Sequence, residues 1–230
     1  MTRQSWPSAF IFDLDGVVTD TAQLHYVAWR ALALDLGIAF DETHNEQLKG
    51  LSRMDSLDRI LALGTRQFDP SEKLAMAERK NAHYLALVEK MTPADLLPGA
   101  LEALCAARAA GCGVALASSS KNAALVLERL GIAGAFDHVV DSNRIRNAKP
   151  HPEVFLAAAK ALALAPRDCV GIEDAVAGVQ AIRAAGMFAV GVGDPQVLSQ
   201  ADQVIADLRH FLPSNYVRGT QRLRWADSPP

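Results

Sequence analysis

Residues 9–16 read AFIFDLDG, and the rest of the fold can be worked out from this stretch. Four consecutive apolar residues are typical of a short strand that is buried on both faces. The two carboxylates that follow, Asp13 and Asp15, are two residues apart and can face the same side of the chain. Gly16 permits the sharp turn that ends the strand. The stretch therefore predicts a strand of a parallel sheet that ends in a pair of acids.

Further apolar runs alternate with segments of helical pattern along the chain. Additional strands are predicted at 113–118, 138–140, 169–172, 188–192 and 203–206. Helices are predicted between them at 100–111, 122–131, 152–164 and 175–186, several of which end at glycine. Alternation of strand and helix predicts an α/β fold with a doubly wound, Rossmann-like parallel sheet.

About 100 residues separate the first two predicted strands, which is far more than a crossover needs. Apolar residues from Leu24 to Leu32 recur at helical spacing within a segment that runs from 21 to 36. Two more helical patterns lie at 54–63 and 71–90. We therefore predict an inserted α-helical cap domain at 20–91. The α/β core is then discontinuous, with parts at 1–19 and 92–230, and the hinges lie near 18–21 and 91–98.

The composition excludes several classes of protein. The chain has 230 residues, of which 50% are hydrophobic and 21% charged, so it is long enough and apolar enough to bury a large core. Its net charge of −3 argues against a chain devoted to binding nucleic acid or an anionic membrane. No apolar run reaches the roughly 18 residues of a membrane span. We expect a cytoplasmic protein with no nucleic-acid or membrane partner, and a monomer, since no heptad pattern demands association.

Polar residues follow four of the predicted strands, at the edge where open parallel sheets bind ligands. In chain order they are Asp13 with Asp15, the run SSSKN at 118–122, Lys149, and Glu173 with Asp174. Converging carboxylates repel one another unless a hard cation lies among them, and Mg²⁺ suits oxygen ligands. The run at 118–122 leads into a helix and would suit a phosphate, although simple helix capping is the alternative. An aspartate nucleophile, a cation and a lysine make a workable site for phosphoryl transfer.

The segments FDLDGVVTDT, ALASSSKN, NAKPHPEVF and GIEDAVAG carry these polar residues, and through them nearly the whole chain resembles the haloacid dehalogenase superfamily. More narrowly, the predicted cap resembles that of the β-phosphoglucomutases, one family of this superfamily. The similar stretches are TAQLHYVAWRAL at 21–32, NEQLKGLSRMDSL at 45–57 and RKNAHY at 79–84. The cap carries the narrower resemblance because many phosphatases share the core motifs.

The resemblance implies roles in the transfer itself. Asp13 would be the nucleophile that becomes phosphorylated, and Asp15 the general acid and base. Ser118 and Lys149 would hold the transferring phosphoryl group. One Mg²⁺ per site would be bound by the metal set, which comprises the Asp13 carboxylate, the Asp15 main-chain carbonyl and Asp174, with Glu173 close by.

The resemblance also implies a sugar pocket and a second phosphate site. Arg53 from the cap and Ser120, Lys121 and Asn122 from the core would grip the distal phosphate of a bisphosphate. Ser119 would donate a backbone N–H to the transferring group. Further residues would belong to the hinge, shape the pocket or couple cap closure to Asp15, namely Thr21, His25, Lys49, Gly50, Leu51, Ser52 and Lys80.

Two positions depart from the mutase pattern. Ala175 stands where serine is usual, which removes a hydroxyl beside the metal set. Ser119 stands where alanine is usual, and little should change because this residue would act through its backbone.

The activity implied by the resemblance is an isomerase reaction. β-D-Glucose 1-phosphate would be converted to β-D-glucose 6-phosphate through an aspartyl phosphate and β-glucose 1,6-bisphosphate, which would also be the activator. A Mg²⁺-dependent sugar-phosphate phosphatase with the same core is the alternative, and a non-catalytic sugar-phosphate sensor is a third hypothesis. The second phosphate site favours the mutase, and the nucleophile argues against the sensor because binding alone does not require one.

Overall fold

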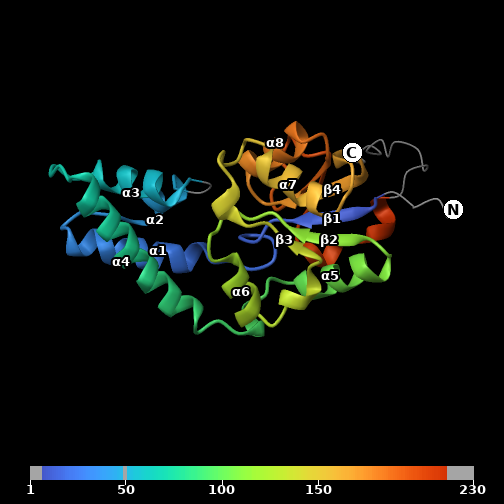
Figure 1. Cartoon of the computed structure of the whole chain (residues 1–230), viewed down its shortest axis with the longest axis horizontal. Coiled ribbons are helices and arrows are strands. Elements are labelled where there is room, and N and C mark those ends of the chain that lie inside the picture. Colours follow the sequence, from blue (N-terminus) through green and yellow to red (C-terminus); the bar gives the residue numbers. More distant parts are fainter. Residues whose placement is uncertain (1–6, 49–50, 217–230) are drawn as a thin grey trace, which may run out of the picture.

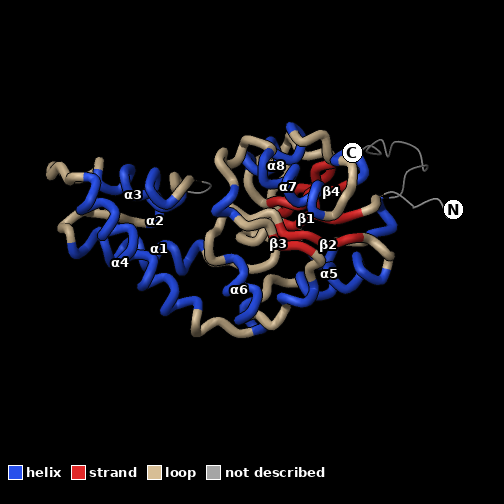
Figure 2. The backbone as a smooth tube through the Cα atoms, viewed as in Figure 1, coloured by secondary structure: helices blue, strands red, loops and turns tan. Residues whose placement is uncertain are grey.

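A six-stranded parallel sheet in the order β3-β2-β1-β4-β5-β6 forms the centre of the computed structural model, which describes residues 7–48 and 51–216 (Figures 1 and 2). The strands are β1 (Ala9–Phe12), β2 (Gly113–Leu116), β3 (His138–Val139), β4 (Cys169–Glu173), β5 (Phe188–Val192) and β6 (Gln203–Ile205). The strand order reverses direction between β1 and β4, so the topological switch point of the sheet lies there. The predicted doubly wound α/β sheet is confirmed.

Helices cover both faces of the sheet because successive side chains of a strand point to opposite faces. The helices of this part of the chain are α5 (Ala100–Ala109), α6 (Ala123–Arg129), α7 (Glu153–Ala161) and α8 (Val176–Ala184). Phe10 and Phe12 of β1 pack in one apolar cluster with residues of α5 and α6. Ala9 and Ile11 pack in a second cluster with residues of α7 and α8. All four side chains of β1 are fully buried, as its sequence predicts.

Short 3₁₀ helices complete the described part of the core. They are η1 (Pro93–Asp95), η2 (Ala133–Ala135), η3 (Ser142–Arg144), η4 (Pro166–Asp168), η5 (Leu208–His210) and η6 (Pro213–Tyr216). Within residues 7–48 and 51–216, no helix is both long enough and apolar enough to cross a membrane.

A second group of helices lies beside the sheet (Figure 1). It consists of α1 (Ala22–Asp35), α2 (Glu42–Glu46), α3 (Arg53–Leu61) and α4 (Pro70–Val88), which we call the cap helices. They enclose an apolar cluster of their own, in which Trp29, Leu57 and Ile60 are buried. The helices at 21–36, 54–63 and 71–90 were predicted to within two residues, whereas α2 was not, because its sequence ETHNE carries no apolar periodicity. The exact domain boundaries, 19/20 and 91/92, stay a prediction.

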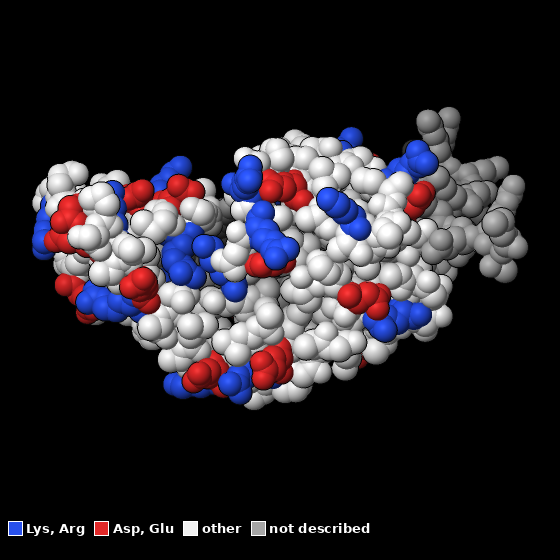
Figure 3. Space-filling view, viewed as in Figure 1, with Lys and Arg blue, Asp and Glu red and all other residues white. Residues whose placement is uncertain are grey.

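The two linkers between the cap helices and the sheet run side by side. The Leu97 N–H donates to the Val18 carbonyl at 3.0 Å. The hydroxyl of Thr19, a fully buried residue, donates to the Asp95 carbonyl at 2.7 Å. Both ends of the insertion therefore meet at one place, within the predicted hinge segments. Figure 3 shows Lys and Arg side chains gathered where the cap helices face the rest of the molecule.

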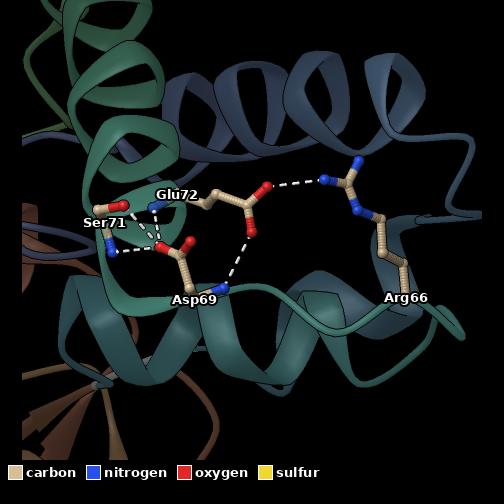
Figure 4. A network of polar contacts seen from close by, with 4 residues as sticks. All are labelled: Arg66, Asp69, Ser71 and Glu72. Atoms are coloured by element: carbon tan, nitrogen blue, oxygen red, sulfur yellow. Dashed lines mark hydrogen bonds and ion pairs between the residues drawn. The ribbon is translucent and has the colours of Figure 1, made fainter.

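The longest cap helix, α4, begins with a capping box (Figure 4). The Asp69 carboxylate accepts hydrogen bonds from the backbone N–H groups of Ser71 and Glu72, at 2.7 and 2.9 Å. Glu72 in turn accepts from the Asp69 N–H at 2.9 Å and pairs with Arg66 at 2.7 Å. These contacts satisfy N–H groups that the first turn of a helix leaves without intrahelical partners.

Replacing the capping aspartate is expected to destabilise the protein. Asp69→Ala removes the carboxylate that accepts from the Ser71 and Glu72 N–H groups and should lower the free energy of unfolding by about 1 kcal/mol. The measurement is urea denaturation followed by circular dichroism. Asp58→Ala is the control, because it removes only the exposed ion pair with Lys73 and should cost no more than about 0.5 kcal/mol. Equal effects of the two substitutions would contradict the capping role.

Candidate active site

The carboxyl ends of β1 and β4 bring two acids together. The strands pair in parallel with Phe12 opposite Ile172, so Asp13 follows β1 beside Glu173, the last residue of β4. Asp13 is only 7% exposed and Glu173 only 1%. Burial, with the nearby charge of Glu173, raises the pKa of Asp13 to about 6. Burial also raises the pKa of Glu173, so both carboxylates need a cationic partner to stay ionised.

Lys149 supplies this partner. Its Nζ atom lies 2.6 Å from Asp13 Oδ1 and 2.8 Å from Glu173 Oε2. Burial opposes the lysine charge, but the two carboxylates outweigh it and raise the pKa of Lys149 above its usual range. The lysine is therefore a permanent cation between the two acids.

A half-buried acid shapes the loop that carries Lys149. The Glu153 carboxylate, at the start of α7, accepts hydrogen bonds from the backbone N–H groups of Arg146 and Asn147, at 3.0 and 2.9 Å. It also accepts from the Asn147 side chain at 2.8 Å. This contact ties the loop before Lys149 to the helix after it.

Asp174 completes a cluster of carboxylates. Asp13, Glu173 and Asp174 each offer one oxygen, and these three oxygens lie within 4.8 Å of one another. Such a donor set suits a hard divalent cation. Gly16 leaves space for it, because a Cβ atom there would lie 2.0 Å from Asp174 Oδ2. The residues present therefore fit a bound Mg²⁺.

Asp15 is fixed at the start of α1. One of its carboxylate oxygens accepts from the Thr21 N–H at 3.1 Å and also from the Thr21 hydroxyl. Burial, with the charge of Asp13, raises the pKa of Asp15 to about 6, against these two hydrogen bonds. A carboxyl group with such a pKa takes up and releases a proton near neutral pH, as a general acid and base must.

A second buried lysine lies among the cap helices. Lys80, only 3% exposed, places its Nζ atom 2.6 Å from His25 Nδ1 and 4.5 Å from the centroid of the Trp29 ring. Burial, with the charge of Lys80, lowers the pKa of His25 to about 3, so the imidazole is neutral and accepts a hydrogen bond from the lysine. Burial lowers the pKa of Lys80 to about 7. The Tyr84 ring stacks on His25 with centroids 4.1 Å apart.

The loop after β2 holds the candidate phosphate ligands of the core. Ser118 is buried, and its hydroxyl accepts from the Ser120 N–H at 3.0 Å. The Ser120 hydroxyl accepts from the Asn122 N–H at 3.3 Å. From the cap, Arg53 donates to the side-chain oxygen of Asn81 at 2.7 Å, and the Asn122 amide donates to the same atom at 3.1 Å. The predicted distal-phosphate residues Arg53 and Asn122 thus meet across Asn81.

The structure brings together four groups of the predicted site residues. They are Asp13 with Lys149, Glu173 and Asp174; Asp15 with Thr21; His25 with Lys80; and Arg53 with Asn122, to which Ser120 and Ser118 are joined. Ser52 caps α3 by accepting from the Asp55 N–H at 3.2 Å. Leu51, Ser119 and Lys121 are exposed, and their contact with a ligand stays a prediction. Lys49 and Gly50 lie outside the described residues.

Sequence reasoning missed Tyr84 and Asn81. Tyr84 had a usable signal, because it lies four residues after Lys80 and therefore on the same face of α4. Asn81 gave no signal, since its partners lie 28 and 41 residues away in the chain.

The fold and the site together define a class of protein. It is a doubly wound α/β protein whose switch point carries a buried carboxylate, a cation-binding cluster of acids and a neutralising lysine, with a helical insertion between its first two strands. The sequence profile of haloacid dehalogenase-like hydrolases matches residues 7–186, and the chain belongs to this family.

Individual relatives are similar over most of the chain. A β-phosphoglucomutase of Bacillus subtilis (strain 168) is 47% identical over 199 residues, which cover 86% of this chain and 88% of the relative. The crystal structure of a β-phosphoglucomutase from Clostridium difficile is 49% identical and superposes with a TM-score of 0.84, covering 87% of this chain and 91% of that one. A fructose-1-phosphate phosphatase of Escherichia coli (strain K12) is 33% identical over 186 residues, covering 80% of this chain and 96% of the relative.

Adding a methyl group at Gly16 is expected to weaken cation binding strongly. Gly16→Ala would place the new carbon against Asp174, so we expect Mg²⁺ affinity measured by calorimetry to fall at least about 100-fold. Gly186→Ala is a matched control: both glycines have a φ of +76°, but nothing lies within 4 Å of a Cβ at 186. Loss of Mg²⁺ affinity in both variants would assign the effect to backbone strain. An unchanged affinity in Gly16→Ala would contradict the idea that the site needs the space beside Gly16.

Removing the buried charge of Lys80 is expected to stabilise the protein in a pH-dependent way. Well below pH 7 the lysine is protonated in both the folded and the unfolded state, so the folded state bears the full cost of a buried cation. Between pH 7 and 10.5 only the unfolded chain keeps the proton, so the stability of the natural protein rises with pH and the cost disappears.

Lys80→Met should therefore raise Tm by about 4 °C at pH 6.5 and by progressively less as the pH approaches 10. Scanning calorimetry across this range measures the difference. Lys90→Met, at an exposed position, is expected to change Tm little at any pH. A gain from Lys80→Met that does not vary with pH would contradict the role of the charge.

Proposed function

We propose that this chain catalyses the β-phosphoglucomutase reaction, interconverting β-D-glucose 1-phosphate and β-D-glucose 6-phosphate. The observation that carries the proposal is the meeting of Arg53 from the cap with Asn122 from the loop that begins at Ser118. It offers a second anion site in addition to the one at Asp13. A mutase needs two phosphate sites because its intermediate carries two phosphates, whereas a phosphatase needs one. The relatives that are 47% and 49% identical carry the same name.

The first half of the reaction begins with a phosphorylated Asp13. The 6-hydroxyl of β-glucose 1-phosphate attacks the phosphorus, and Asp15 accepts the hydroxyl proton. The bond between phosphorus and the Asp13 oxygen breaks, and its electron pair returns to the Asp13 carboxylate. The product is β-glucose 1,6-bisphosphate, and Asp15 is left protonated.

The second half follows once the bisphosphate has turned round in the site. The Asp13 carboxylate attacks the phosphorus of the 1-phosphate, and Asp15 returns its proton to the departing oxygen of C1. Glucose 6-phosphate leaves, and Asp13 is phosphorylated again. A pKa of about 6 lets Asp15 serve both halves, since neither its protonated nor its ionised form is strongly disfavoured near neutral pH. Thr21 keeps this carboxyl in one orientation.

Fixed charges supply the remaining stabilisation. Lys149 lies against Asp13 and would neutralise the transferring phosphoryl group together with the Ser118 hydroxyl. Enzymes of this family generally use Mg²⁺. Asp13, the Asp15 carbonyl and Asp174 would hold the ion, with Glu173 close by. When bound, the ion would offset the charge of the phosphoryl oxygens during transfer.

The other expectations belong to the same proposal. Glucose 1,6-bisphosphate would act as intermediate and activator, which phosphorylates an empty enzyme. The partner is a small sugar phosphate, the protein is a cytoplasmic monomer, and the cap domain spans 20–91. Gly50, Leu51 and Ser52 would shape the sugar pocket, and Lys49 would also bind the substrate. Ser119 to Asn122 would hold phosphate, and the contact of Lys80 with His25 would couple cap closure to the alignment of Asp15.

A sugar-phosphate phosphatase is the second candidate, favoured by the 33% identity to a fructose-1-phosphate phosphatase. It would use the same Asp13 and Lys149 but would pass the phosphoryl group to water. The two candidates differ in their need for Arg53.

A coupled assay separates the candidates. With Mg²⁺, β-D-glucose 1-phosphate and a trace of glucose 1,6-bisphosphate, we expect glucose 6-phosphate without appreciable free phosphate, and no product from Asp13→Ala. Arg53→Ala should slow isomerisation by on the order of 100-fold, while hydrolysis of acetyl phosphate, which needs no second site, changes less than about 2-fold. Arg59→Ala, on the same helix but exposed, is the matched control. Free phosphate without glucose 6-phosphate would establish the phosphatase instead.

A further inference from the structure

One side-chain oxygen accepts hydrogen bonds from both halves of the molecule. Arg53, at the start of α3, donates from Nη2 to Asn81 Oδ1 at 2.7 Å, and Asn122, just before α6, donates from Nδ2 to the same oxygen at 3.1 Å. Arg53 and Asn81 belong to two different cap helices, and Asn122 follows the sheet strand β2. The three residues therefore join α3, α4 and the 118–122 loop at one point.

The chemistry of the side chains fixes the direction of both hydrogen bonds. A guanidinium group only donates, so the Asn81 atom that faces Arg53 must be the amide oxygen. Because that oxygen also faces Asn122, Asn122 must present its NH₂ group. Two donors, one of them charged, thus converge on one acceptor at distances that a phosphate oxygen would also take.

The charge of Arg53 is not matched at this point. Within residues 7–48 and 51–216, the Arg53 guanidinium donates a hydrogen bond to the neutral amide of Asn81. In this part of the chain Arg53 forms no ion pair with a carboxylate within 4.0 Å. The guanidinium is half-buried and has further N–H groups to offer. An arginine held by a neutral acceptor, with its charge uncompensated, is ready to bind an anion.

We propose that Asn81 is a positioning residue for the second phosphate: its amide oxygen holds Arg53 of the cap and Asn122 of the core at the spacing of one shared anion. This inference rests on the proposed function, which supplies the anion as the distal phosphate of the bisphosphate. Arg53 and Asn81 both lie in the cap, so their hydrogen bond survives a movement of the cap. The contact with Asn122 forms only when the cap meets the loop after β2.

Two substitutions distinguish this role from simple bridging between helices. Asn81→Leu removes the acceptor, so Arg53 loses its orientation. Asn81→Asp keeps an acceptor for both donors but adds a negative charge beside the bound phosphate. A bridge without a role in anion binding would be restored by aspartate. A residue that sets the anion site would be damaged more by aspartate than by leucine, because the added carboxylate pairs with Arg53 and repels phosphate.

The test is calorimetric titration of glucose 1,6-bisphosphate, with Mg²⁺ present, into protein in which Asp13→Asn prevents transfer. We expect Asn81→Leu to weaken the affinity about 10-fold and Asn81→Asp about 100-fold. With Asp13 intact, hydrolysis of acetyl phosphate should change less than about 2-fold in either variant, because this donor reacts without the second site. The control is His83→Leu, which introduces the same leucine at an exposed position of the same helix.

Each outcome decides the inference. Bisphosphate binding that is unchanged by Asn81→Leu, or restored to the natural affinity by Asn81→Asp, overturns it while leaving the proposed function intact. Failure of the Asp13→Asn protein to bind bisphosphate at all, with Asn81 unaltered, overturns both. Graded weakening in the order leucine then aspartate, with acetyl phosphate hydrolysis preserved, supports the positioning role.

Discussion

A carboxylate removed from water beside a second carboxylate is stable only when a cation is shared between them, and Lys149 is that cation. Parallel pairing of β1 with β4 forces Asp13 and Glu173 together, so the lysine must be delivered from elsewhere. It comes from the loop between β3 and α7, which Glu153 ties down. The position of this loop, the strand order and the acidic site therefore depend on one another. Any change that withdraws the lysine would leave two buried like charges unbalanced.

The second buried lysine shows the opposite case. Lys80 meets a neutral imidazole and an aromatic ring in place of carboxylates, so burial dominates and its pKa falls, whereas that of Lys149 rises. Lys149 thus stabilises the arrangement around it, while Lys80 is held at a cost by the packing of α1 and α4. Costly buried groups are typical of functional positions. The proposal that Lys80 couples the cap to Asp15 is consistent with this cost.

The sequence was sufficient for those features that depend on local pattern or on parallel topology. The AFIF run predicted a strand buried on both faces, and four polar strand ends predicted an acidic site at one edge of the sheet. Contacts between distant segments could not be read in this way. No local sequence pattern indicates that Gly16 leaves room for Asp174, or that Asn81 faces Arg53 and Asn122. The short helix α2 was missed because it begins with an Asp41 cap and not with an apolar stripe.

The adjacency of the two linkers affects how proteins of this fold can diversify. Val18 and Leu97 are hydrogen-bonded although nearly eighty residues separate them, so the ends of the insertion are already adjacent. Closing a loop between adjacent ends costs an entropy that grows only slowly with the length of the loop. The cap can therefore be lengthened, shortened or exchanged in evolution without disturbing the sheet that carries Asp13. One catalytic half can then be recombined with different substrate-binding modules.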